Sequence, residues 1–198
     1  MEKKNKMETM HMQKLVINMS LPLIVSLLVQ SLYNIVDSIF VAKMSEEALT
    51  ATSLAFPVQM LMIAFSVGTS VGVNALLSKT LGARNRERAT KIANTSIMLA
   101  LINGAVFSLT GIFFAQKLAR SFTTVESTAA LCAEYLSICM VFCFGNFIET
   151  MLQRFLQAAG NTVLSMCSLI AGAVTNKMLD PILIFGLLGF PALGIRGA

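Results

Sequence analysis

The sequence has little charge and no tryptophan. Only 13% of its 198 residues are Asp, Glu, Lys or Arg, whereas a soluble domain carries about 25%. The single histidine is His11, so neither His-based catalysis nor a His metal site is expected. The four cysteines form no CxxC pair and lie in apolar stretches, as small packing residues do. With no nucleophile–base pair and no ligand cluster in the sequence, we expect neither an enzyme nor a resident cofactor.

Apolar residues fill the chain instead. They make up 56% of it, and its mean hydropathy is +0.74. They gather in stretches that each exceed the ~20 residues a helix needs to cross a bilayer. The predicted spans are about 15–42, 52–78, 92–116, 131–153 and 162–188. Because the alternating strands of outer-membrane barrels are absent, we predict an all-α integral membrane protein built as a helical bundle.

Lys and Arg residues divide unevenly between the two sides of this bundle. If the basic tail 1–14 is cytoplasmic, ten of them fall on inner segments, four on outer segments and Lys177 inside a span. The positive-inside rule then predicts a multi-pass protein of the plasma (inner) membrane with a cytoplasmic amino terminus. We interpret the basic segment 79–91 as a solvated cytoplasmic loop that fixes the membrane topology. We therefore expect the lipid bilayer as a partner and no nucleic acid.

Two carboxylates lie inside predicted spans. A charge at the bilayer centre costs about 2.5–3.5 kcal/mol, so such a residue marks a functional site by default. Asp37 lies about 5 residues, or 8 Å, before the outer end of its span, and Asp180 about 8 residues, or 12 Å, before its own. Both spans run outward, which puts the two carboxylates in the same outer half. We predict a cation or proton site between helices; the alternative is that each Asp snorkels or bonds locally.

Polar neighbours support the functional interpretation. Gln30, Asn34 and Asp37 share one helical face, and Tyr33 precedes Asp37 by one turn. In the fifth span, Asn176 lies one turn before Asp180 on the same face.

The Asp180–Pro181 pair adds a further oxygen to this predicted site. Pro181 lacks an amide proton, which frees the carbonyl of Lys177 and predicts a kink there. A freed carbonyl, a carboxylate and an amide are hard oxygen ligands. They suit either a sodium ion or a proton as the coupling ion, and the sequence does not choose between them.

Two other features of the spans have weaker assignments. Glu149 is deeper toward the cytoplasm, where a structural pair with Arg154 is favoured over a place on a proton path. The residues Ala64, Gly68 and Gly72 repeat at four-residue spacing, which is typical of close helix packing.

Several motifs resemble one transporter family. They are 34–41 (NIVDSIFV), 156–161 (LQAAGN), 176–186 (NKMLDPILIFG) and 191–198 (PALGIRGA). On these residues the chain resembles the amino-terminal half of a multidrug and toxic compound extrusion (MATE) transporter, and the match runs over nearly the whole chain.

The resemblance implies a twelve-helix fold of two six-helix lobes, of which 15–198 supplies five helices and stops before the sixth. It implies sodium- or proton-coupled export of small organic cations or drugs. Asp37, Asn176 and Asp180 match the family's amino-lobe cation site. Lys177 stands where the family usually has an apolar residue and, like Glu149, would modulate that site.

A chain with only this lobe is not expected to transport, since alternating access needs two lobes. Two alternatives stay open. One is a flippase for lipid-linked oligosaccharides from the same superfamily, which is disfavoured because Lys177 is the only cation well inside a span. The other is a truncated membrane protein that does not transport.

Overall fold

The computed structural model describes residues 11–42 and 45–185, which form α-helices and no strand. The helices are α2 (Met12–Ala42), α3 (Glu46–Gly82), α4 (Arg86–Phe122), α5 (Glu126–Val141), α6 (Phe144–Ala158) and α7 (Thr162–Phe185). The predicted all-α class is confirmed. Most of the predicted tail, the last residues of the fifth predicted span and the 191–198 motif lie outside the described residues.

The long helices have the length and composition of membrane spans. At 37 residues each, α3 and α4 are about 55 Å long, more than the 40–45 Å of a bilayer with its headgroups. Within the described ranges, Met12–Val36, α3 and α4 are each apolar and long enough to cross, and α5 with α6 adds a fourth span as a bent pair. The apolar described part of α7, Thr162–Asn176, is shorter.

Local sequence signals define the helix starts. The Ser45 hydroxyl accepts a hydrogen bond from the amide of Ala48 at 3.0 Å, and Asn85 caps α4 through the amide of Arg88 at 3.0 Å. Such caps satisfy amides that the first turn leaves without a partner. Between α3 and α4 the chain reverses at Arg84, whose φ of 56° is in the left-handed region.

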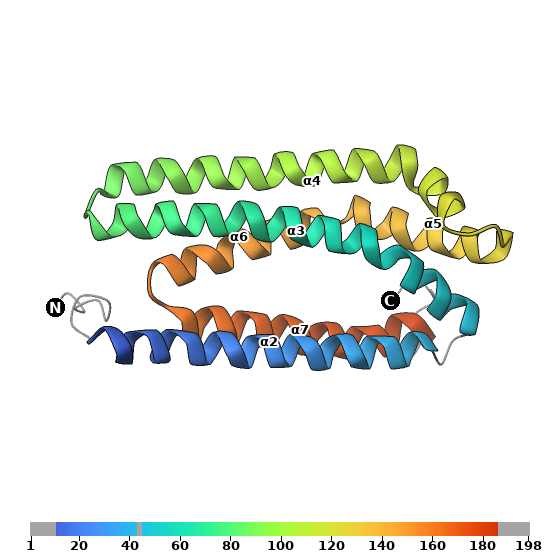
Figure 1. Cartoon of the computed structure of the whole chain (residues 1–198), viewed down its shortest axis with the longest axis horizontal. Coiled ribbons are helices and arrows are strands. Elements are labelled where there is room, and N and C mark those ends of the chain that lie inside the picture. The colour runs from blue at the N-terminus through green and yellow to red at the C-terminus, as the bar shows by residue number, and fades with distance from the viewer. Residues whose placement is uncertain (1–10, 43–44, 186–198) are drawn as a thin grey trace.

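The helices divide into two groups (Figure 1). The first consists of α3, α4, α5 and α6, and the second is the pair α2 and α7, which lie against each other. Small side chains form much of the buried contact in the first group. One cluster contains Ala48, Ala51, Ala55, Ala115, Ala119, Cys132 and Leu136. These small residues let the helix backbones approach closely, which is how membrane helices gain packing energy.

The span predicted at 131–153 is not one continuous helix. The chain breaks after Val141, and α5 and α6 meet at a bend of 46°. At the break the Cys143 thiol donates to the Gly104 carbonyl at 3.5 Å, and the Phe144 ring packs on Gly104. No proline marks this break in the sequence, so the single-helix expectation was wrong at a place where contacts with α4 decide the local structure.

Close approach also occurs at different glycines from those expected. A Cβ added at Gly68 or Gly72 would have no neighbour within 4 Å, so this repeat packs against no described helix. A Cβ at Gly111 of α4 would lie 2.5 Å from Cβ of Met140 on α5, which is a clash. The tight helix contact of this lobe is therefore between α4 and α5.

This contact predicts opposite effects for two identical substitutions. Gly111→Ala should lower the free energy of unfolding by about 1–3 kcal/mol, because overpacking forces α4 and α5 apart. Gly68→Ala, which meets open space, should be neutral or slightly stabilising, since Ala favours helix over Gly. Thermal unfolding in detergent measures both. Equal melting temperatures for the two variants would contradict the assigned α4–α5 contact.

Candidate functional site

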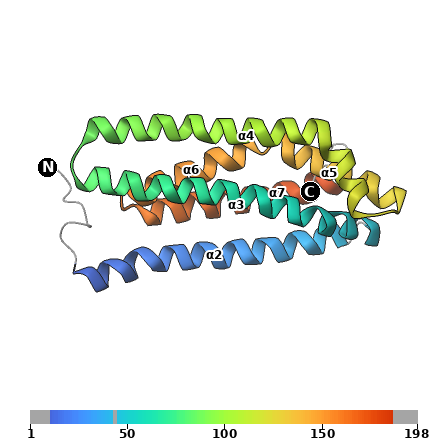
Figure 2. The same cartoon turned by 45° about the horizontal axis from the view of Figure 1, so that its top comes forward.

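The two helices that carry the predicted site lie side by side. In Figures 1 and 2, α2 and α7 run in the same direction, and their backbones are in contact. Asp37 lies five residues before the end of α2, and Asp180 lies five residues before the end of α7. The fold thus brings two segments far apart in sequence to the same end of one helix pair.

Part of the predicted ligand set is placed by helix and register alone. The side chains of five residues lie outside what the structure describes: Tyr33, Asp37, Lys177, Asp180 and Pro181. By register, Asn176 and Asp180 stay on one face of α7, and Lys177 follows at about 100° around the helix axis. The ligand set itself remains a prediction.

The described polar side chains of these helices lie on open faces. Gln30 and Asn34 of α2 and Asn176 of α7 are all exposed in the lobe. The Ser38 hydroxyl donates to the Asn34 carbonyl at 3.0 Å, so this turn carries additional polar groups. Polar side chains at membrane depth are expensive against lipid, so these faces suit a water-filled cavity or a partner surface.

The 156–161 motif builds the turn that connects α6 to α7. Gln157 is buried; its amide accepts from Arg154 at 2.8 Å and donates to the Ser165 hydroxyl at 3.1 Å. Gly160 has a φ of 80°, a left-handed conformation that favours glycine. Asn161 then accepts from the amide of Leu164 at 3.2 Å and caps α7. Gln157, Gly160 and Asn161 therefore each have a physical role in connecting α6 to α7.

Glu149 has a different partner from the one expected. Its carboxylate accepts from the Gln153 amide at 3.0 Å and lies 3.9 Å from the position of a Cβ on Gly172 of α7. Arg154 instead donates to Gln157. The expected Glu149–Arg154 pair was wrong because five helical residues rotate the side chains about 140° apart, whereas four keep them on one face.

Together these residues form a polar seam between α6 and α7. We use this name for Glu149, Gln153 and Gln157 on α6 with Ser165 and Gly172 on α7. Sequence reasoning did not identify it as a unit. The signal was present, since the polar residues 149, 153 and 157 recur at every fourth position of α6.

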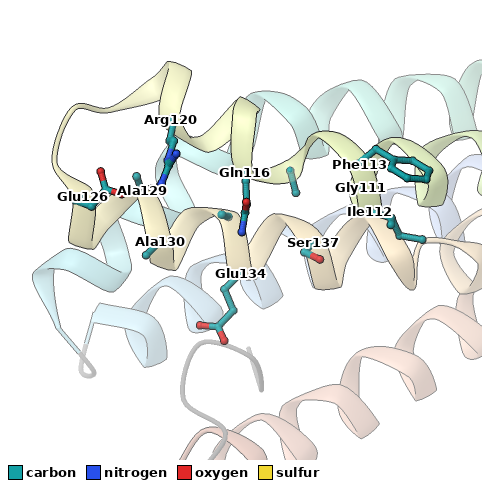
Figure 3. Close-up of a pocket in the computed structure, with 12 residues that line it drawn as sticks. Gly111, Ile112, Phe113, Gln116, Arg120, Glu126, Ala129, Ala130, Glu134 and Ser137 are labelled. Atoms are coloured by element: carbon teal, nitrogen blue, oxygen red, sulfur yellow. Dashed lines mark hydrogen bonds and ion pairs between the residues drawn. The ribbon is translucent and has the colours of Figure 1, made fainter.

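A groove of about 490 Å³ lies elsewhere, between α4 and α5 (Figure 3). Arg120 and Glu126 point toward each other across its end and form an ion pair at 3.0 Å. Glu134 also lines it, on the side away from α4. Among the described residues that line this groove, none belongs to the predicted cation site. In the part of the chain that the structure describes, no three His, Cys, Asp or Glu side chains gather as metal ligands.

Comparison with known proteins identifies the family to which this arrangement of helices belongs. A family model described as MatE matches residues 22–182. A Bacillus subtilis (strain 168) protein, "Probable multidrug resistance protein YoeA", is 32% identical over 181 residues, which cover 89% of this chain and 38% of the relative. The "FAD transporter" of Shewanella oneidensis is 28% identical over 188 residues, covering 93% and 41%.

Solved structures support the same family assignment. An outward-facing multidrug resistance MATE family transporter of the MOP superfamily superposes with a TM-score of 0.90 at 30% identity, covering 99% of this chain and 43% of that one. A MOP superfamily transporter from Pyrococcus furiosus, whose description reports a binding pocket of reverse polarity, gives 0.89 at 29% identity, covering 98% and 42%.

The fold is that of one lobe of the multi-pass membrane transporters to which the chain is similar. The chain belongs to the MatE family, the MATE transporters. It spans about two fifths of the length of the curated relatives it matches, and its similarity is to their amino-terminal half.

The α6–α7 turn predicts a stability effect at Gln157. Gln157→Leu removes two hydrogen bonds and leaves the buried Ser165 hydroxyl without its donor, which should cost about 1–3 kcal/mol. Gln116→Leu, at an exposed position on α4, is the matched control and should change little. Melting temperatures in detergent compare the two. An unchanged value for Gln157→Leu would show that the bridge adds no stability.

Proposed function

We propose that this chain is the amino-terminal lobe of a cation-coupled antiporter that exports drug-like, often cationic organic compounds. Membership in the MATE family supports the class, as do the multidrug names of one relative and one similar structure. The observation that carries the coupling site is the pairing of α2 with α7, which puts Asp37 and Asp180 at the same end of adjacent parallel helices. In this proposal Asp37, Asn176 and Asp180 bind the coupling ion, either sodium or a proton.

The surrounding residues assist that site. Its polar face comprises Gln30, Tyr33 and Asn34. Pro181 opens the α7 backbone beside Asp180, and Lys177 and Glu149 adjust the charge around it. The lobe works against a carboxy-terminal lobe, and the two rock between inward-open and outward-open states. The amino terminus is on the cytoplasmic side of the plasma membrane.

A second candidate is transport of an anionic substrate. One relative is named an FAD transporter, and one similar structure is described as having a binding pocket of reverse polarity. Lys177, a cation inside a predicted span, favours an anionic substrate, whereas a flippase for lipid-linked oligosaccharides would need more such cations than this one. Assays with both a cationic dye and FAD distinguish an antiporter for cations from a carrier for anions.

Neutralising either carboxylate should uncouple transport in the two-lobe protein. Asp37→Asn and Asp180→Asn should each reduce efflux of ethidium by roughly 5- to 150-fold, the span of typical coupling free energies. Efflux from cells energised with a sodium or a proton gradient measures this change and identifies the coupling ion.

Glu47→Gln is the matched control, because Glu47 is exposed in the first turn of α3. It should export at the normal rate. If Asp37→Asn and Asp180→Asn also export at the normal rate, these carboxylates are not the coupling site.

The lobe alone should be inactive. Residues 1–198 expressed by themselves should insert into the membrane but produce no efflux above empty cells, since one lobe has no counterpart to rock against. Co-expression with the carboxy-terminal lobe provides the positive comparison. Export by residues 1–198 alone would disprove the need for two lobes.

A further inference from the structure

Glu149 lies close to the middle of the membrane. It precedes Ala158, the last residue of α6, by nine residues, and the Gly172 position beside it follows the start of α7 by ten. These separations correspond to about 14 and 15 Å, half of a ~30 Å hydrocarbon core. A carboxylate at this depth is costly unless it serves a function or meets water.

The polar seam continues from Glu149 toward the inner end of the lobe. Gln153 bonds to Glu149 at 3.0 Å, and one turn further Gln157 bonds to Ser165 at 3.1 Å. In the other direction, Gly172, Asn176 and Asp180 follow one another at four-residue spacing along α7. Polar or side-chain-free positions thus extend along α6 and then along α7, from the inner turn to the predicted coupling site.

Few other charged residues lie near Glu149. The helices α3 and α4 carry their charged residues only near their ends. The nearest charged residues on α6 and α7 are Arg154, Lys177 and Asp180, and Arg154 donates to Gln157. Within the described residues, Glu149 offers one carboxylate with one amide donor. That is too few oxygen ligands for a metal ion, whereas a proton needs only the carboxylate.

We propose that Glu149 is a proton-binding residue on the inner route from the coupling site to the cytoplasm. This inference rests on the proposed antiport function. The proton leaves the carboxylic acid of Asp180 for water, and water then protonates the carboxylate of Glu149. The about 12 Å between the two levels on α7 requires such water, and Asn176 lies halfway to hold it. Glu149 then releases the proton along the seam to cytoplasmic water.

The test uses the purified two-lobe protein in liposomes with an imposed pH gradient. Ethidium uptake measures net antiport, exchange of internal for external ethidium at equal pH measures transport without net proton movement, and fluorescence anisotropy measures ethidium binding. Glu149→Gln is compared with Glu149→Asp, which keeps the acid, and with Glu47→Gln. Asp180→Asn is assayed in parallel.

The proposal expects Glu149→Gln to bind ethidium with unchanged Kd and to retain exchange, while gradient-driven uptake falls by roughly tenfold. Glu149→Asp should restore most of that uptake. Normal gradient-driven uptake by Glu149→Gln overturns the proposal, and so does loss of binding and exchange together, which indicates a structural role. If Asp180→Asn is inactive while Glu149→Gln is normal, only this inference fails; if both transport normally, the coupling site of the proposed function fails too.

Discussion

A polar group inside a bilayer has no water to bond to, so each one needs a protein partner or an aqueous cavity. This lobe uses both solutions. Hydrogen bonds between helices join Gln59 to Tyr135, Asn103 to Thr69 and Gln157 to Ser165. Those bonds lie within the α3–α6 group or tie α7 to it. Other polar residues, such as Asn34 and Glu149, lie exposed on open faces of the lobe, which suit an aqueous cavity or a partner surface.

The packing of the first helix group is compatible with the proposed coupling site at the second. Lipid tails are as apolar as the helices, so close van der Waals contact drives association. The alanines of α3 and α4 and the glycines Gly104 and Gly111 allow such contact. The pair α2 and α7 lies alongside that group and carries the residues of the proposed coupling site.

The sequence predicted the features that a bilayer requires of the helices that cross it. Apolar runs of sufficient length identify helices, and depth counting placed Asp37 and Asp180 at a similar level before any contact was known. The break at Cys143 was not predictable in this way, because it depends on Phe144 packing against Gly104, 40 residues away in sequence. The hydrogen bond from Gln153 to Glu149 follows from their four-residue spacing, which the sequence shows. The approach of Glu149 to Gly172 depends on which face of α6 meets α7, and no local signal states that.

The depths of Asp37, Asp180 and Glu149 along their helices bear on how a coupling ion would reach the cytoplasm. In the proposed orientation Asp180 lies 18 residues, or about 27 Å, from the inner start of α7, so an ion bound there has most of the hydrocarbon core to cross before it reaches the cytoplasm. Hydrocarbon offers no route, and α3 and α4 carry no charged residue across this depth. Within the described residues, the polar seam is the series of polar groups that continues inward from this level. A route along α6 and α7 therefore fits the chemistry better than a direct exit from Asp180.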